Sequence, residues 1–109
     1  MISILTLYLV GGGLLVALSL PLLFDKIPPN PLYGFRVPKT LNDPKIWYAA
    51  NRYSARWLLG AGASILIAAV LFYFIPGITL DVYALGCLGV SMVALTVGLW
   101  KSFLYLRNL

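Results

Sequence analysis

The sequence contains no histidine and no glutamate, and its only side-chain carboxylates are Asp25, Asp43 and Asp81. General acid–base catalysis and metal binding draw mainly on these residue types, so their scarcity argues against most hydrolytic and metal-dependent enzymes. The single cysteine, Cys87, lies in an apolar stretch and has no second thiol for a disulfide or a metal site. We expect Cys87 to be a packing residue, and we expect no catalytic residue, metal or cofactor.

Charge is also missing from three long stretches, residues 1–24, 57–80 and 82–100. The shortest has 19 residues and would span roughly 28 Å as a helix, close to the hydrocarbon thickness of a bilayer. The chain is 61% hydrophobic with a mean hydropathy of +0.94, which excludes an ordinary water-soluble domain. We predict an all-α integral membrane protein, one membrane domain over residues 1–109, with transmembrane helices at about 2–24, 55–75 and 81–101.

The first apolar stretch has a cleaved secretory signal as its alternative explanation. However, no Lys or Arg precedes its apolar run, the run is longer than a normal signal core, and no small-x-small cleavage site precedes Phe24. We therefore expect an uncleaved first span.

The eight basic residues are distributed unevenly. Two follow the third span, Lys101 and Arg107, and six fall between the first and second spans: Lys26, Arg36, Lys39, Lys45, Arg52 and Arg56. The positive-inside rule then places the N-terminus outside, and the connector of about residues 25–54 and the C-terminus in the cytoplasm. This topology predicts a multi-pass membrane protein whose connector faces the cytoplasm.

The connector is rich in proline, with five of the seven prolines between residues 28 and 44. Proline fixes φ and removes a hydrogen-bond donor, so we expect a stiff segment without regular helix. Gly34 is the natural position for a turn with positive φ. Headgroup depth suits the amphipathic aromatics of the connector, Tyr33, Phe35 and Trp47. We call residues 30–40, NPLYGFRVPKT, the hook, and expect it at the cytoplasmic membrane surface.

A helix is predicted to begin after the hook, because Asp43 can cap it and Pro44 suits its first position. We expect it to continue into the second span with its first turns outside the hydrocarbon. At 100° per residue one face is basic and carries Lys45, Tyr48, Ala49, Arg52 and Arg56. The opposite face is expected to pack and carries Trp47, Asn51, Ser54, Leu58 and Ala61.

If the turn at Gly34 brings Arg36 and Lys39 near Arg52, these cations would form an anion site. Lys and Arg beside cytoplasmic span ends are equally well explained as topology determinants that touch anionic lipid headgroups. Small residues also recur along the spans: Gly11–Gly13, Gly60, Ser64, Cys87, Ser91, Ala94 and Gly98. They are expected to pack helices within one protomer, with a homo-oligomer face as the alternative.

Residues 30–52, NPLYGFRVPKTLNDPKIWYAANR, resemble the signature of the SdpI family of bacterial membrane proteins, named for immunity to a secreted toxic peptide. The positions that carry the resemblance are Asn30, Gly34, Arg36, Pro38, Thr40, Leu41, Trp47, Asn51 and Arg52. The resemblance implies a short stand-alone version of the family's signature module. Many members have His followed by Arg where this chain has Asn51 and Arg52, so no role for a titrating imidazole is expected.

From these positions and their neighbours, the candidate ligand-binding or motif residues are Asn30, Tyr33, Gly34, Arg36, Pro38, Lys39, Thr40, Trp47, Asn51 and Arg52. The resemblance implies a non-enzymatic protein that protects against or senses a membrane-active toxic peptide, with a peptide toxin or a cytoplasmic regulator as partner. The alternative is an interfacial site for an anionic lipid headgroup or another phosphate-bearing ligand, in an enzyme or a small transporter. Spans without internal charge argue against a transporter, and basic residues confined to membrane flanks argue against nucleic-acid binding.

Overall fold

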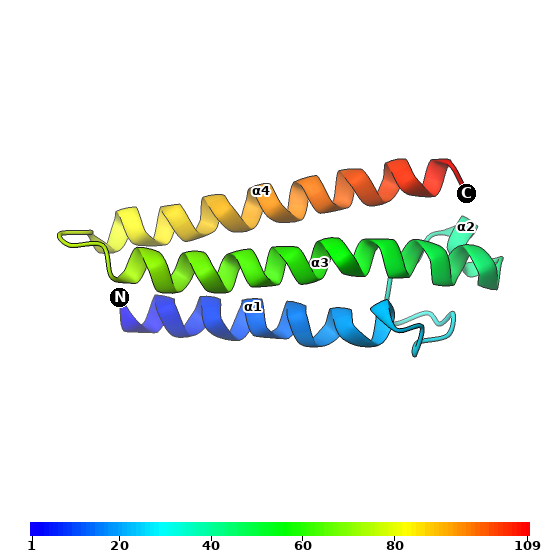
Figure 1. Ribbon diagram of the computed structural model, residues 1–109, viewed down its shortest axis with the longest axis horizontal. Helices are drawn as coiled ribbons and strands as arrows, with labels where there is room; N and C mark the ends of the chain where they lie inside the picture. Colours follow the sequence, from blue (N-terminus) through cyan, green and yellow to red (C-terminus); the bar gives the residue numbers. More distant parts are fainter.

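The computed structural model covers residues 1–109 and contains helices but no strands. The helices are α1 (Ile2–Leu23), α2 (Pro38–Leu41), α3 (Pro44–Tyr73) and α4 (Leu80–Arg107). The three long helices lie side by side, with the N-terminus at one end of the bundle and the C-terminus at the other (Figure 1). Each of the three is long and apolar enough to cross a membrane. The prediction of an all-α membrane protein with three spanning helices is confirmed.

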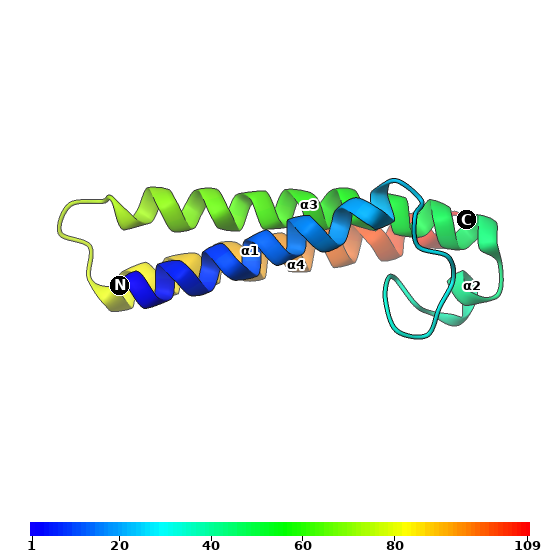
Figure 2. The same ribbon diagram turned by 90° about the horizontal axis from the view of Figure 1, so that it is seen from below.

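The central helix is α3, because α1 and α4 both pack along it (Figures 1 and 2). α1 approaches α3 closely where Gly12 faces Gly62. A Cβ atom on Gly62 would lie 2.8 Å from Gly12 O, and one on Gly12 would lie 3.0 Å from Gly62 O. These two glycines therefore permit the backbones to meet, as small residues do between membrane helices.

Side chains from all three long helices meet at the end of the bundle away from the connector. Tyr83 is fully buried, and its hydroxyl donates a hydrogen bond to Ala69 O over 2.8 Å. Cys87 is buried beside these two residues, and Tyr8 packs against the cluster. The prediction that Cys87 is a packing residue is confirmed.

The helix starts follow from their capping residues. Asp43 Oδ1 accepts a hydrogen bond from Lys45 N over 2.9 Å, and Pro44 occupies the first position of α3, as predicted. The 30 residues of α3 extend over about 45 Å, so the helix is longer than the hydrocarbon core of a bilayer. At the other end, Thr79 Oγ1 caps α4, and Asp81 lies in its first turn, where the helix dipole favours an anion.

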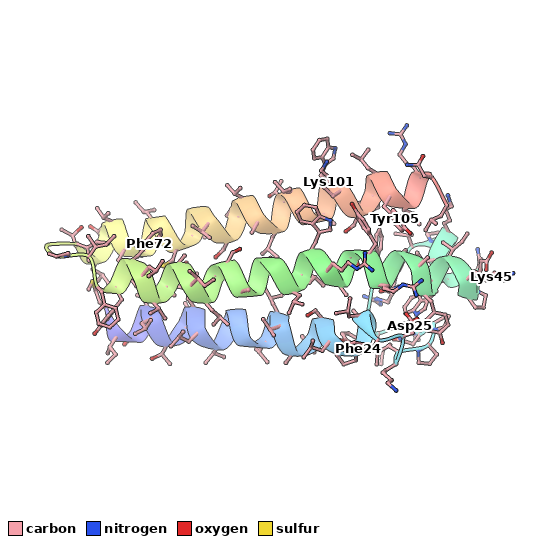
Figure 3. All side chains as sticks on the ribbon, in the orientation of Figure 1. Phe24, Asp25, Lys45, Phe72, Lys101 and Tyr105 are labelled. Atoms are coloured by element: carbon pink, nitrogen blue, oxygen red, sulfur yellow. The ribbon has the colours of Figure 1, made fainter.

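The two faces predicted for the first half of α3 are confirmed. Trp47, Asn51, Ser54 and Ala61 are buried, whereas the basic face exposes Lys45, Arg52 and Arg56. Charged side chains gather in the half of the bundle that holds the connector, including Asp25, Lys45 and Lys101 (Figure 3). Phe72 marks the opposite end.

Two expectations about the connector are wrong. It contains one short helix, α2, because Pro38 sits at the first helical position, where its missing N–H costs nothing and its fixed φ suits the turn. Trp47 does not lie among headgroups. Its side chain has 0% exposure, since its Nε1–H donates to Ile27 O over 2.8 Å and its ring packs under Gly34.

Candidate functional site

The hook begins with a turn organised by Asn30. Its Oδ1 accepts hydrogen bonds from Leu32 N over 2.9 Å and from Tyr33 N over 2.7 Å. Its Nδ2 donates to Pro28 O over 2.8 Å and to Tyr33 O over 3.0 Å. Asparagine often organises turns in this way, because its short amide side chain reaches backbone groups two or three residues away. This side chain fixes the bend that the prolines introduce.

The next bend requires glycine at position 34. Gly34 has φ of +114°, in the region that side chains rarely adopt, as the sequence predicted. A Cβ atom there would lie 2.8 Å from Asn51 Oδ1 and 3.0 Å from the Trp47 ring. Both the backbone conformation and the lack of space therefore exclude a side chain, and the hook rests directly on α3.

Asn51 holds the hook to α3 from a buried position, with 1% of its surface exposed. Its Oδ1 accepts a hydrogen bond from Phe35 N, and its Nδ2 donates to Phe35 O over 3.4 Å and to Trp47 O over 2.9 Å. The Asn51 side-chain amide thus forms hydrogen bonds with both the backbone N–H and the backbone C=O of Phe35. Asn51 therefore positions the backbone of the hook, and an unpaired Phe35 N–H would be costly at this depth.

Thr40 is the second buried anchor, with 0% exposure. Its Oγ1 accepts a hydrogen bond from Val37 N over 3.0 Å and donates to Phe35 O over 2.8 Å. Pro38 starts the short helix that holds Thr40 in this place. The end of the hook is thereby folded back on its middle.

Contacts from the hook reach the other two long helices. The Tyr33 hydroxyl donates to Leu18 O of α1, and burial raises the pKa of the Tyr33 phenol above its ordinary value. Lys39 Nζ donates to Leu106 O near the end of α4 over 2.8 Å. The Phe35 ring lies edge-on to the Phe103 ring, with 5.0 Å between centroids. The hook is tied to α1, α3 and α4 together.

The three candidate cations each have a different partner. Arg36 Nη1 donates to Pro31 O within the hook, Lys39 binds α4, and Arg52 forms an ion pair with Asp25 over 3.2 Å. Asp25 follows the C-cap of α1 and has a φ of +58°. Its carboxylate reaches Arg52 on α3 from this turn. The side chains are thus engaged separately, and Arg36 is the cation that faces the cavity described next.

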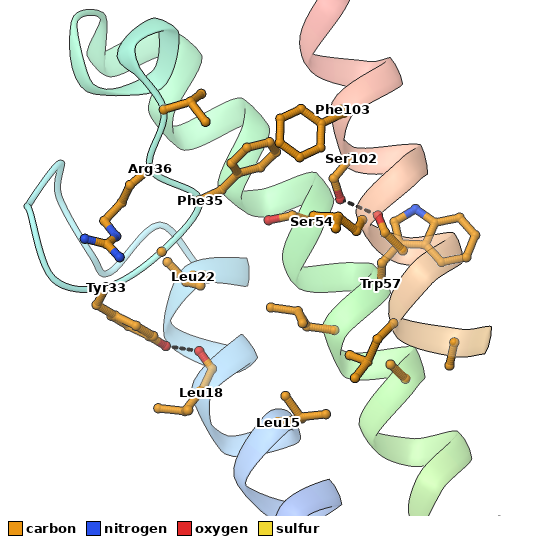
Figure 4. Close-up of a pocket in the computed structure, with 18 residues that line it drawn as sticks. Leu15, Leu18, Leu22, Tyr33, Phe35, Arg36, Ser54, Trp57, Ser102 and Phe103 are labelled. Atoms are coloured by element: carbon orange, nitrogen blue, oxygen red, sulfur yellow. Dashed lines mark hydrogen bonds between the residues drawn. The ribbon is translucent and has the colours of Figure 1, made fainter. Parts of the chain in front are cut away.

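A cavity of about 530 Å³ lies under the hook, between α1 and α4 and against α3. Figure 4 shows Tyr33, Phe35 and Arg36 at its hook end and Leu15 of α1 farther in. Thirteen of its 18 lining residues are hydrophobic, so the cavity suits an apolar group. Volumes of roughly 300–1,000 Å³ are usual for small-molecule sites.

Of the predicted site residues, Tyr33, Gly34 and Arg36 line the cavity. Six of the others shape the hook or hold it against the helices: Asn30, Pro38, Lys39, Thr40, Trp47 and Asn51. Arg52 pairs with Asp25, outside the hook. Trp57 and Phe103 also line the cavity but were not among the predicted residues. No local motif marks them, because they reach the cavity only through helix packing. The pairing of Phe35 with Phe103 joins segments far apart in the chain.

Comparison with known proteins identifies the family of the chain. Residues 26–102 match the SdpI/YfhL protein family, and this range holds the hook, α3 and most of α4. The chain belongs to the SdpI/YfhL family. The resemblance seen in residues 30–52 is therefore confirmed, and all ten candidate residues lie within the matched range.

A relative in this family is the uncharacterized protein YfhL of Bacillus subtilis (strain 168). The two chains are 38% identical over 72 residues, which cover 59% of this chain and 64% of the relative. The match thus spans less than two thirds of the relative's length. No solved structure matches the chain. SdpI/YfhL membership establishes a membrane protein of this family.

Proposed function

We propose that this SdpI/YfhL protein is a non-enzymatic protein of the bacterial cytoplasmic membrane that protects against or senses a membrane-active toxic peptide through its hook. The observation that supports the proposal is the attachment of the hook to three helices through Tyr33, Asn51 and Lys39. A segment held in this way presents Arg36 at a fixed place instead of on a mobile loop. Fixed presentation suits recognition, because little conformational entropy is lost on binding.

The orientation is part of the proposal. All eight Lys and Arg residues flank the hook end of the three helices or belong to the connector. The positive-inside rule then puts the hook in the cytoplasm and the N-terminus outside. The protein would act on a peptide, or on a membrane disturbed by it, from the cytoplasmic side.

The carboxylates support a function without covalent chemistry. Asp25 pairs with Arg52, Asp43 caps α3, and Asp81 lies at the other end of the bundle in the first turn of α4. Each aspartate has a structural role, and none of them lines the cavity. General acid–base catalysis in the cavity would have to depend on Tyr33, whose pKa is raised further from neutral by burial.

The test is protection of bacteria against a purified membrane-active peptide of the kind for which the family is named, followed by a membrane-potential dye. Cells carrying the wild-type protein should keep their potential, whereas Arg36→Ala should abolish protection while the protein stays inserted. Lys101→Ala is the matched control, because Lys101 lies over the Trp100 ring away from the hook, and it should protect fully. Full protection by an inserted Arg36→Ala protein would contradict the proposal.

A second candidate function is binding of an anionic lipid headgroup or another phosphate-bearing ligand at the hook. It is favoured by several exposed cations at this end that have no carboxylate partner, among them Lys26, Arg36, Lys45 and Arg56. Native mass spectrometry of the gently extracted protein tests this candidate. The wild type should retain an anionic ligand that the Arg36→Ala, Arg52→Ala double variant loses. Equal retention by the two proteins would exclude an anion site at the hook.

A further inference from the structure

We infer that the cavity under the hook receives one acyl chain of an anionic phospholipid from the surrounding bilayer, with the lipid phosphate held by Arg36. The inference deepens the second candidate function and rests on it, because it states where the rest of a lipid would lie once its headgroup is bound. It is carried by the shape of the cavity, by its opening and by the charge at its hook end.

The shape of the cavity suits a hydrocarbon chain. Its lining runs along α1 from Leu15 to Leu22 and along α4 from Ala94 to Phe103. At the rise of an α-helix, these stretches are about 10–14 Å long, from the hook toward the middle of the bundle. The cavity therefore extends along the bundle axis, which is the direction of acyl chains in a bilayer.

Its walls offer almost nothing to a polar ligand. The two serines in the lining are already engaged, since Ser54 Oγ donates to Asn51 O over 3.2 Å and Ser102 Oγ donates to Gly98 O over 2.7 Å. The remaining deep lining is aliphatic or aromatic. Apolar surface of this kind is filled most favourably by methylene groups, each contributing about 0.8 kcal/mol when removed from water.

The cavity opens sideways between α1 and α4. Leu18 on α1 is 49% exposed and Leu99 on α4 is 61% exposed, although both line the cavity. These two helices pack along α3 and approach each other little. In a membrane the opening faces lipid, so a chain can enter laterally without leaving the hydrocarbon.

Charge at the hook end selects the headgroup. Arg36 lines the cavity there, and no carboxylate lines any part of it. One guanidinium nitrogen donates to Pro31 O, which fixes the group and leaves other N–H donors for a phosphate. Arginine binds phosphate through two parallel hydrogen bonds, so a held guanidinium above an apolar cavity matches an anionic lipid.

Two of the three tryptophans provide a direct measurement, because Trp57 lines the cavity and Trp100 is 59% exposed on the outside of α4. The third, Trp47, is 0% exposed and contributes the same background fluorescence to both single-substitution proteins. Trp100→Phe and Trp57→Phe proteins are reconstituted in phosphatidylcholine vesicles and titrated with brominated-chain phosphatidylglycerol or brominated-chain phosphatidylcholine. In Trp100→Phe, Trp57 should be quenched by the brominated phosphatidylglycerol at about fivefold lower mole fraction. This is the order expected when one cation meets an anionic headgroup in place of the zwitterionic phosphatidylcholine headgroup, whose choline offsets its phosphate. In Trp57→Phe, Trp100 reports lipid on the outside of α4, beside Lys101, and its quenching should not change when Arg36 is replaced by glutamine.

Three further substitutions, made in the Trp100→Phe background, distinguish binding of the acyl chain from binding of the headgroup. Circular dichroism first checks that each protein has native helix content. Arg36→Gln should remove the fivefold preference. Arg107→Gln, which removes an exposed cation outside the cavity lining, should retain it. Ala94→Phe places a ring in the deep part of the cavity and should remove the preferential quenching of Trp57.

The outcomes distinguish this inference from the candidate function on which it rests. Equal quenching of Trp57 by the two lipids, unchanged by Arg36→Gln, would overturn both the lipid site and the anion site. If Ala94→Phe still retains phosphatidylglycerol in native mass spectra and Trp57 quenching is also unchanged, no acyl chain lies in the cavity. The headgroup site would then remain. Absence of quenching of Trp57 by either lipid would overturn the inference and direct attention to a peptide as occupant.

Discussion

Asn51 of α3 holds both backbone polar groups of Phe35 in the hook, 16 residues earlier in the chain. The relationship joins the most irregular segment of the protein to its most regular one. Its energetic importance follows from the burial of Asn51, which is 1% exposed, because a buried amide that loses its hydrogen-bond partner has little water to replace it.

Replacing Asn51 with leucine, which has a similar volume, should destabilise the protein by about 1–3 kcal/mol, because it leaves a buried N–H group unpaired. Unfolding in mixed micelles at increasing SDS fraction measures this free energy. Asn42→Leu is the matched control, since Asn42 is exposed at the end of α2, and it should change the free energy of unfolding little. Equal effects of the two substitutions would show that Asn51 does not anchor the hook.

Tyr33 provides a prediction about pH. Burial raises its folded-state pKa above the ordinary value of 10.0, so the hydroxyl remains a donor to Leu18 O throughout the neutral range. The stabilisation is therefore fully present below about pH 10 and is lost as the pH rises through the raised pKa. The difference in thermal stability between wild type and Tyr33→Phe should be constant from pH 6 to 9 and shrink above 10. A difference that changes between pH 6 and 9 would assign the effect to another group.

The helices could be predicted from the sequence because their signals are local. Uncharged stretches of membrane length, Asp43 followed by Pro44, and Gly34 between aromatics each report a property of the residues themselves. The two faces of α3 followed from helical periodicity alone. The ten candidate site residues came instead from the family resemblance and neighbouring positions, and of these the structure brings Tyr33, Gly34 and Arg36 to the cavity.

The cavity could not be predicted, because it is formed by residues from α1, the hook, α3 and α4 that share no local pattern. Trp47 shows the same limit. Aromatics in a connector usually lie at headgroups, but the Ile27 carbonyl and the absent side chain of Gly34 provide a buried place for its ring. The burial of Trp47 depends on the connector folding back against α3, and sequence periodicity does not predict that contact.

The crossing of α1 and α3 provides a third prediction. Gly62→Ala would put a methyl group 2.8 Å from Gly12 O, so the helices must move apart, at a cost of about 1–3 kcal/mol as in other overpacked sites. Gly60→Ala is the matched control, two residues away on the same helix, with nothing within 4 Å of the new methyl group. It should be neutral or slightly stabilising through helix propensity. SDS-induced unfolding of both variants checks the difference, and equal stability of the two would refute a close crossing at Gly62.

The contact between Lys39 and α4 supplies the last prediction. Lys39 Nζ donates to Leu106 O over 2.8 Å, in the last turn of α4, where the helix dipole favours a cation. Lys39→Met should cost on the order of 0.3–1 kcal/mol, and its larger effect should be on the position of the hook relative to α4.

Spin labels at the exposed positions Asn42 and Asn108, in a Cys87→Ala background, measure the distance between the end of the hook and the end of α4. Lys39→Met should broaden this distance distribution, because the polar link between the two segments is lost while the Phe35–Phe103 contact remains. Lys45→Met, which removes an exposed cation from the start of α3, should leave the distribution unchanged. If the Lys39→Met distribution is as narrow as that of the wild type, the aromatic contact alone fixes the hook against α4. Closure of the cavity at this side would then depend on Phe35 and Phe103 and not on charge.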